Sequence, residues 1–371
     1  MTTYQTTLLR SWREVEDLWP EWRALLPLTR ADSIFLTPEW VQAWRGAMSG
    51  VELAPRVAAA RASDGTLVGI APFYRISERL AGVVPLDVLR VLGDYPGGAV
   101  YGDLIVHPSH DGAADALFAA LLADRADAIW MPHTATWNGA AAQLRTLAKR
   151  HGQHISTRQH ALYHFSLPDT YEAFEGALSK STRKDFRRAA RKLLDSGLTE
   201  LARCESAAQV DGFVERLIDL NTRRWAGEKR EGVFVRKPKE AEFYRLFAPI
   251  AQERGWLQFL ELFHEGDVLA TEVGYVYGNT YYCMQAGVDP NGPGGAGKVL
   301  LNEMIRCQIE SGVAEFDFMT GDADYKKRYA ASERTTEDLF IVRPSLKTLP
   351  IRVAGIWPRG RYLDFNDPAR Y

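Results

Sequence analysis

The chain has 371 residues, of which 46% are hydrophobic and 25% are charged, and its formal net charge is -2. This is ordinary globular composition, and it excludes disordered, collagen-like and coiled-coil proteins. At roughly one domain per 150 residues, the length predicts about two domains. Charges are balanced in both halves, so contact with phosphate or nucleic acid would require a local basic patch.

The N-terminal sequence carries charges where a signal peptide needs an apolar run. No stretch approaches the roughly 20 apolar residues of a membrane span. We therefore expect a cytoplasmic protein without a transmembrane segment. Cys204, Cys283 and Cys307 are few and widely separated, which disfavours a disulfide framework or a structural zinc site.

The first half predicts mixed α and β structure. The stretch from Ser11 to Ala47 has a helical pattern rich in tryptophan, which we expect in a core. A turn signal between two apolar runs predicts a hairpin. The strands and helix expected after Ala47 are Arg56–Ala60, Thr66–Pro72, Tyr101–Val106, Ala113–Leu122 and Ala128–Met131.

The second half has clearer periodicity, and short turn signals in its middle predict an antiparallel meander of three strands. The tail from Pro344 is proline-rich and is expected to pack irregularly. Expected helices are Asp169–Leu178, Ser179–Leu194, Ala207–Ala226, Lys239–Glu253, Lys298–Glu310 and Ala323–Ala331. Expected strands are Thr199–Cys204, Trp256–Phe263, Val268–Tyr277, Thr280–Val288, Ala314–Met319 and Thr335–Val342.

A glycine loop, with Gly294, Gly295 and Gly297, precedes the helix that begins at Lys298. Backbone N–H groups at a helix start are unpaired and carry partial positive charge, so such a loop can hold phosphate oxygens. A connector without a ligand is the alternative. The loop also nearly matches a P-loop, but Val299 stands where that motif requires Ser or Thr.

A basic segment runs from Lys180 to Lys192, with seven cations and a single acid, Asp185. On a helix, spacings of three and four place Lys180, Lys184, Arg187 and Arg191 near one face. We expect Arg187 and Arg191 to contact an anionic partner such as a nucleotide phosphate, tRNA or a membrane surface. A solvated face between two domains is the alternative.

The order of elements in the second half resembles the GNAT N-acyltransferase fold. Specific segments resemble its FemABX-like and CelD-like (cellulose-biosynthesis-type acetyltransferase) branch. These are Val288–Pro290, the glycine loop, Phe316–Gly321, Tyr325–Tyr329, and in the first half Phe35–Trp40 and Gly102–Pro108. The resemblance implies an α/β (α+β, mixed-sheet) fold of two tandem GNAT-like domains. We expect limits of 1–165 and 166–345, followed by a tail at 346–371.

The resemblance further implies an N-acyltransferase with acyl-CoA, such as acetyl-CoA, as its co-substrate. Gly294, Gly295, Gly297 and Lys298 would contact this donor, together with the basic segment. The acceptor would be an amine of a small molecule, an amino sugar or a cell-envelope precursor. A FemABX-like ligase that uses aminoacyl-tRNA is the alternative, because Asn291–Pro293 replace the Arg or Gln that usually precedes the loop of coenzyme A enzymes. A binding protein without catalysis is a third.

Three residues are candidates for catalysis. Glu272, inside an expected strand, could deprotonate the attacking amine; a surface strand residue is the alternative. By resemblance to a Tyr/Phe-Lys pair near the acyl donor in FemABX-like enzymes, Lys326 would stabilise the oxyanion. Tyr325 could protonate the leaving group. A lysine-rich helix end with Tyr325 and Tyr329 packed together is the alternative reading.

Two histidine pairs have spacings that suit a metal, His151 with His154 and His160 with His164. Nothing in the sequence supplies a carboxylate or thiolate to complete either set. The sequence therefore predicts neither a metal site nor a tightly bound cofactor.

Overall fold

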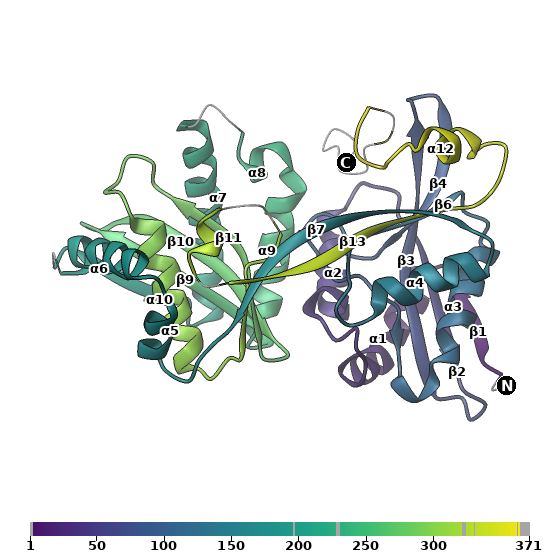
Figure 1. Cartoon of the computed structure of the whole chain (residues 1–371), viewed down its shortest axis with the longest axis horizontal. Coiled ribbons are helices and arrows are strands. Elements are labelled where there is room, and N and C mark those ends of the chain that lie inside the picture. Colours follow the sequence, from purple (N-terminus) through teal and green to yellow (C-terminus); the bar gives the residue numbers. More distant parts are fainter. Residues whose placement is uncertain are drawn as a thin grey trace. The chain divides into compact units, whose positions relative to one another are not determined.

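The computed structural model describes residues 3–195, 197–227, 231–320, 324–329, 331–361 and 363, and the following statements concern those residues. The chain divides into two compact units. Unit 1 comprises Met1–His160 and Thr335–Tyr371, and unit 2 comprises Ala161–Arg334. Strands β7 (His154–Ser166) and β13 (Ser332–Val342) each run from one unit into the other (Figure 1).

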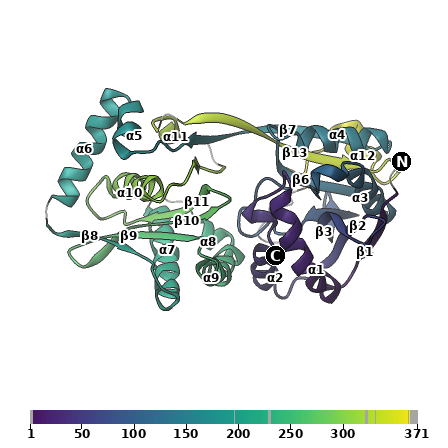
Figure 2. The ribbon, with the colours of Figure 1, turned by 90° about the horizontal axis from the view of Figure 1, so that it is seen from below.

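Unit 1 is built on a mixed sheet in the order β1-β2-β3-β4-β6-β13, with β5 paired to β3. β4 and β6 are parallel, whereas β13 returns antiparallel to β6. Figure 2 shows helices on both faces of this sheet. Its strands are β1 (Gln5–Leu9), β2 (Ala54–Arg61), β3 (Leu67–Leu80), β4 (Val84–Val91), β5 (Ile105–Val106) and β6 (Ala128–Ala135). Its helices are α1 (Trp12–Leu25), α2 (Pro38–Ala47), α3 (Gly112–Ala123), α4 (Ala140–Arg150) and α12 (Leu349–Ala354), with 3-10 turns η1 (Leu26–Leu28), η2 (Ile34–Leu36) and η3 (Pro108–His110).

Local sequence explains the two N-terminal helices of unit 1. The Ser11 hydroxyl accepts from the Glu14 N–H and the Glu14 carboxylate accepts from the Ser11 N–H, which forms a capping box at the start of α1. α2 begins at Pro38 after Thr37, which caps it. Of the five tryptophans expected in a core, Trp22, Trp40 and Trp44 are fully buried, whereas Trp12 and Trp19 are half-buried.

Unit 2 has the sheet order β7-β12-β11-β10-β9-β8. The predicted meander is confirmed, since β9, β10 and β11 pair antiparallel in sequence order. Figure 2 shows α5, α6 and α10 over one face and α7, α8 and α9 over the other. The strands are β8 (Thr199–Arg203), β9 (Leu257–His264), β10 (Asp267–Tyr277), β11 (Thr280–Val288) and β12 (Glu315–Asp317). The helices are α5 (Tyr171–Ala177), α6 (Lys180–Leu194), α7 (Ala207–Gly227), α8 (Val233–Arg236), α9 (Pro238–Glu253), α10 (Ala296–Glu310) and α11 (Asp324–Lys327).

Several elements differ from the sequence predictions. β1, β4, α4 and β7 were not predicted, and the tail forms a short helix, α12, where irregular packing was expected. The compact units also differ from the predicted domain limits, because Thr335–Val342 pairs with β6 and groups with the first half. Gly321 and the first residue of the helix expected at Ala323–Ala331 lie outside the described residues.

Among the described residues, we find no helix whose length and hydropathy would let it cross a lipid bilayer.

Candidate active site

A pocket of about 710 Å³ lies in unit 2 between the middle of the sheet and the starts of α10 and α11. Glu272 of β10 and Cys283 of β11 line it, together with Lys298 of α10 and Tyr325 of α11. The sequence-predicted residues Glu272, Tyr325, Gly297 and Lys298 are thus brought together. The other lining residues are Phe186, Arg224, Ala286, Val288, Pro290, Asn291, Leu301, Arg328 and Tyr329.

Glu272 is a buried carboxylate, 2% exposed, and not the surface strand residue of the alternative reading. Its Oε1 accepts from the Tyr281 hydroxyl at 3.2 Å and from the Cys283 thiol at 3.7 Å. Burial raises the pKa of Glu272 to about 7, and the two hydrogen bonds oppose this rise. At neutral pH the group is therefore divided between its base and acid forms.

The backbone around Glu272 explains its placement. The pairing of β10 with β11 shifts between Val273 and Gly274, so Met284 is an extra residue on β11 and forms a bulge beside the pocket. A Cβ on Gly274 would lie 2.3 Å from the Tyr281 ring, so only glycine leaves room for this ring. Glycine at this position thus lets the Tyr281 hydroxyl reach the carboxylate.

Tyr325 and Lys326 have different positions although they are neighbours. Tyr325 is 44% exposed and lines the pocket, and burial of its hydroxyl raises its pKa, so the phenol stays protonated. Its ring meets that of Tyr329 edge to face at 6.4 Å, but only Tyr329 is buried, whereas the alternative reading has both tyrosines buried.

Lys326 is 4% exposed and does not line the pocket. Its Nζ donates to the carbonyl oxygens of Phe318, Met319 and Thr320 at 3.0, 3.3 and 2.8 Å. An ammonium group has three donors, and these contacts direct them toward the backbone of this segment. The lysine therefore holds the chain that follows β12, and its predicted contact with an oxyanion stays a prediction.

A second cavity, of about 440 Å³, lies where the glycine loop meets α6. Gly295 caps the start of α10 with a φ of +102°, a left-handed conformation that favours glycine. Lys298 lines both cavities. The full lining of the second cavity is Asp185, Arg188, Ala189, Lys192, Gly294, Gly295 and Lys298.

The basic segment faces this cavity with residues other than those predicted. Arg188 and Lys192 line it, whereas Arg187 and Arg191 do not. Arg187 pairs with Glu175 at 2.8 Å, and Arg191 Nε donates to the Arg187 carbonyl oxygen at 3.4 Å. The face toward α10 contains Asp185 and the residues three, four and seven positions after it, so it lies about 100° around the helix from the predicted face.

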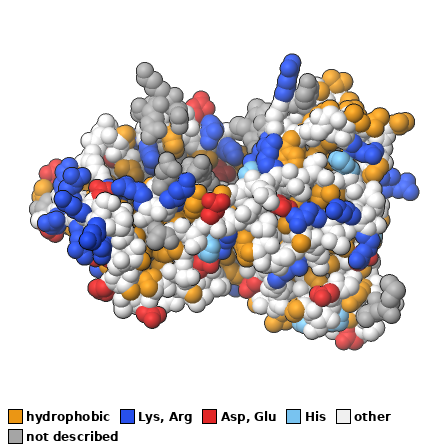
Figure 3. Space-filling view, viewed as in Figure 1, with side chains coloured by type: hydrophobic (Ala, Val, Ile, Leu, Met, Phe, Trp, Pro, Cys, Tyr) orange, Lys and Arg blue, Asp and Glu red, His pale blue; other side chains and the backbone are white. Residues whose placement is uncertain are grey.

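Asp185 organises the cations near the glycine loop. Its Oδ2 lies 2.5 Å from Lys298 Nζ and 3.2 Å from Arg328 Nη2, and its Oδ1 lies 3.6 Å from Arg188. The hydrogen bond from Lys298 is the main cause that lowers the pKa of Asp185. Among the residues that line the cavity, the three cations Arg188, Lys192 and Lys298 oppose this one carboxylate, so the cavity favours an anion. Figure 3 shows Lys and Arg side chains gathered over α6.

Sequence reasoning missed Arg188, Lys192, Arg328 and the Glu272 partners Tyr281 and Cys283. The helical spacing of Asp185, Arg188 and Lys192 was a usable signal for the first two. Tyr281 and Cys283 carry no such signal, because they reach Glu272 only through the register of β10 against β11.

Comparisons with known proteins agree with this architecture. Residues 180–327, all within unit 2, match the family model of the acetyltransferase (GNAT) domain. No curated protein sequence matches the chain. The solved structure of FemX is similar at 12% identity, with a TM-score of 0.58, over 86% of this chain and 95% of that one.

Two further solved structures are similar at 13% identity with TM-scores of 0.54. The C-terminal domain of a putative lysylphosphatidylglycerol synthetase from Agrobacterium fabrum matches over 92% of this chain and 96% of its own. L-PGS from Bacillus licheniformis matches over 92% and 97%. The predicted mixed α/β fold of the GNAT type is confirmed.

Proposed function

We propose that the protein is an N-acyltransferase that moves an acyl group, such as acetyl, from acyl-CoA to an amine by direct attack. The observation that carries this proposal is the buried Glu272 carboxylate in the wall of the large pocket, next to a helix start lined by cations. The GNAT domain match supports acyl transfer as the reaction class. Acyl-CoA is a co-substrate in this proposal, without a tightly bound cofactor.

The proposed reaction uses two groups of the pocket. Glu272, directly or through water, accepts the proton of the amine as its nitrogen attacks the thioester carbonyl carbon. The C–N bond forms, the C–S bond breaks, and the Tyr325 hydroxyl gives its proton to the departing thiolate. Lys326 acts as a positioning residue for the Phe318–Thr320 segment rather than as an oxyanion donor.

In the proposed complex, the donor phosphates lie in the second cavity against the N–H groups at Gly295 and Gly297. The ammonium of Lys298 and the charges of Arg188 and Lys192 offset the phosphate charge. The acyl group then extends into the large pocket, which shares Lys298 with the second cavity.

Charge removal on α6 tests this placement. The double variant Arg188→Gln/Lys192→Gln is expected to raise KM for acyl-CoA by about tenfold and leave kcat within about twofold, because two charge-assisted contacts are lost. The matched variant Arg187→Gln/Arg191→Gln removes the same charge from the face predicted from sequence. Steady-state kinetics in which the second pair matters more than the first would contradict the placement.

The glycine loop gives a second test. Gly295→Val forces a β-branched residue into a φ of +102° and directs it toward Ala189 of α6, whose Cβ would lie 3.4 Å from the new Cβ. We expect acyl-CoA binding to weaken by tenfold or more, measured by calorimetric titration. Gly312→Val is the control, since it forces the same residue into a φ of +71° outside both cavities, with no atom within 4 Å of its Cβ. Equal affinities for the two variants would count against the loop as the phosphate site.

The FemABX-like alternative changes the donor to aminoacyl-tRNA. The seven cations of the basic segment favour it, because a tRNA backbone would contact more of them than one pyrophosphate can. The likeness to FemX extends over most of both chains but concerns the fold alone.

For either donor we propose an amino-sugar or cell-envelope acceptor of the kind used in the CelD-like and FemABX-like branch. The name of the similar lysylphosphatidylglycerol synthetase structure agrees with an envelope role.

A further inference from the structure

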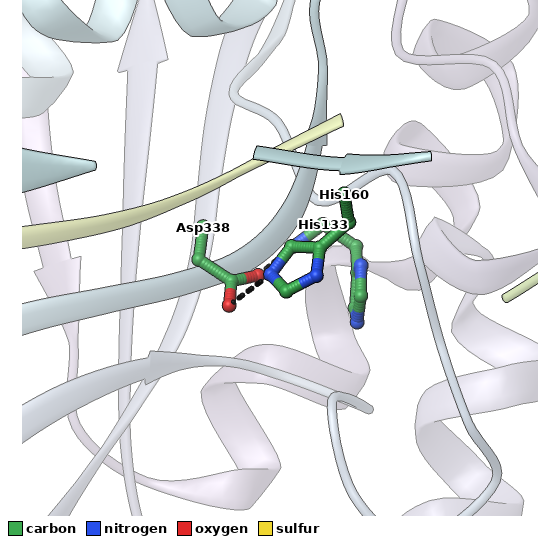
Figure 4. Close-up of side chains that lie close together, drawn as sticks. All are labelled: His133, His160 and Asp338. Carbon is green, nitrogen blue, oxygen red and sulfur yellow. Dashed lines mark hydrogen bonds and ion pairs between the residues drawn. The ribbon is translucent and has the colours of Figure 1, made fainter. Parts of the chain in front are cut away.

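A cluster of two imidazoles and one carboxylate lies in unit 1, outside the acyl-transfer site. His133 comes from β6, His160 from β7 and Asp338 from β13. One potential ligand atom from each residue lies within 4.8 Å of the other two. Figure 4 shows the three side chains together, with a dashed line between Asp338 and His160. We propose that this cluster binds a divalent transition-metal ion of the Zn²⁺ type.

The backbone of β6 is distorted where it supplies the first ligand. Pairing with β13 shifts between Glu337 and Leu339, so that Pro132 and His133 face the single residue Asp338. His133 has a φ of +51°, which is rare for a histidine. Bulges and strained residues of this kind re-aim side chains at functional sites. The bulge turns His133 toward the strand that carries Asp338.

Hydrogen bonds already orient two of the three side chains. Asp338 is fully buried, and its Oδ1 accepts from the His133 backbone N–H at 2.9 Å. The His133 Nδ1 lies 3.4 Å from the Thr336 hydroxyl. Neither contact uses Asp338 Oδ2 or His133 Nε2, and such outer hydrogen bonds are usual around metal-bound histidines and carboxylates.

The third side chain is close enough to complete the set. His160 Nε2 lies 2.8 Å from Asp338 Oδ2, and the His133 and His160 rings have centroids 4.9 Å apart. Ligand atoms of a tetrahedral zinc ion lie roughly 3.3 Å apart, given bonds of about 2.0 to 2.1 Å. Small rotations of the two rings would therefore open the hydrogen bond and admit an ion. His160 is 24% exposed, which leaves a route from solvent.

Ligand chemistry selects the kind of ion. Two imidazoles and one carboxylate suit zinc and its first-row neighbours, whereas Mg²⁺ and Ca²⁺ prefer oxygen ligands. The positive charge of Arg359 disfavours a further positive charge at His133. The negative charge of the buried Asp338 carboxylate offsets this effect. A fourth position is left for water, since the cluster found among the described residues has three members.

The location indicates what the ion would do. Neighbouring strands β6, β13 and β7 supply the ligands, so one ion would tie the returning β13 to the first half of the chain. Such a tie closes long loops between His133, His160 and Asp338, which favours the folded state. The sequence did not predict this site because Asp338, which supplies the carboxylate, is far along the chain from His133 and His160. The sequence instead pairs His160 with His164, whose Nδ1 lies 3.3 Å from Glu315 Oε2.

The test is Zn²⁺ titration of the full chain, without a histidine tag, after treatment with a chelator. We expect one Zn²⁺ per chain and a rise in Tm of about 3 °C or more at saturation. Co²⁺ should give visible absorption bands on binding at the same site. His160→Gln and Asp338→Asn should each weaken Zn²⁺ binding by tenfold or more.

A matched control removes a different histidine of the same unit. His151 lies 3.2 Å from Asp115 Oδ1, so His151→Gln breaks a similar pair outside the cluster and should leave binding unchanged. Circular dichroism establishes that each variant is folded, and if Asp338→Asn is not, His160→Gln alone decides. Absence of stoichiometric binding, or binding that His160→Gln leaves intact, would overturn the proposal.

Discussion

Glu272→Gln is expected to lower kcat for acyl transfer by about 10² to 10⁴-fold, the usual contribution of a general base. Glutamine keeps the shape of the side chain and an oxygen that accepts from Tyr281, but it cannot take a proton. The measurement is steady-state kinetics with acyl-CoA and an amine acceptor. Glu200→Gln, an exposed glutamate on β8, is the control and should leave kcat within about twofold.

The dependence of activity on pH tests the same prediction. The base must be ionised, and the pKa of Glu272 is raised to about 7. Activity should therefore rise with pH through about 7 and reach a plateau above it. The residual rate of Glu272→Gln should lack this rise. A variant that keeps both its rate and its pH profile would show that Glu272 is not the base.

The stability of the folded protein should fall as pH rises, whereas its activity should increase. Burial favours the protonated form, so the folded state loses stability as pH rises from about 4.5, where the unfolded chain ionises, to about 7. With 1.36 kcal/mol for each pKa unit, the loss is on the order of 3 kcal/mol at pH 8. Urea unfolding should show Glu272→Gln as more stable than the parent at pH 8 and nearly equal at pH 5. If Glu272→Gln were less stable than the parent at pH 8, burial would not raise the pKa of Glu272.

Lys326→Met is expected to destabilise the protein by about 2 to 4 kcal/mol, measured by urea unfolding. Methionine fills similar space but leaves the carbonyls of Phe318, Met319 and Thr320 without the ammonium donor. Lys327→Met is the control, since Lys327 is exposed and its Nζ lies 5.9 Å from the Tyr163 ring centroid. We expect a change of about 0.5 kcal/mol or less for that variant.

Kinetics separate a positioning role for Lys326 from the oxyanion role predicted by resemblance. If Lys326 positions the Phe318–Thr320 segment, activity should recover on cooling to a temperature at which the variant is folded. If it binds the oxyanion, kcat should stay reduced by about 10² to 10³-fold in the folded variant. The second result would contradict the positioning role.

The fold of unit 2 could be predicted because its signals are local. Strand β11 has the predicted limits of Thr280 and Val288, and β10 differs from its prediction by a single residue, Asp267. Alternating apolar residues and turn signals determine such strands within a few residues of sequence. The place of Glu272 in β10 could be predicted for the same reason, since it stands inside a well-marked strand, and its role as a base stays a prediction.

Features that depend on long-range pairing could not be predicted. The return of β13 to β6, and with it the division into units, follows from the match of Thr336 with Ala135 some 200 residues away. The His133 bulge and its meeting with Asp338 depend on the same register. On α6, the face that lines the cavity differs from the predicted face because the spacing of charges does not show which side packs toward α10. The buried side chains Phe186 and Leu193 determine that side.

Donor identity is the central claim, and binding across a salt series tests it most directly. The full chain would be titrated with acetyl-CoA, longer acyl-CoAs and aminoacylated tRNA at several salt concentrations. The proposal predicts saturable acyl-CoA binding that Gly295→Val abolishes, followed by acyl transfer to an added amine. No binding of any acyl-CoA, together with tRNA binding that falls steeply with salt, would contradict it and favour the aminoacyl-tRNA ligase.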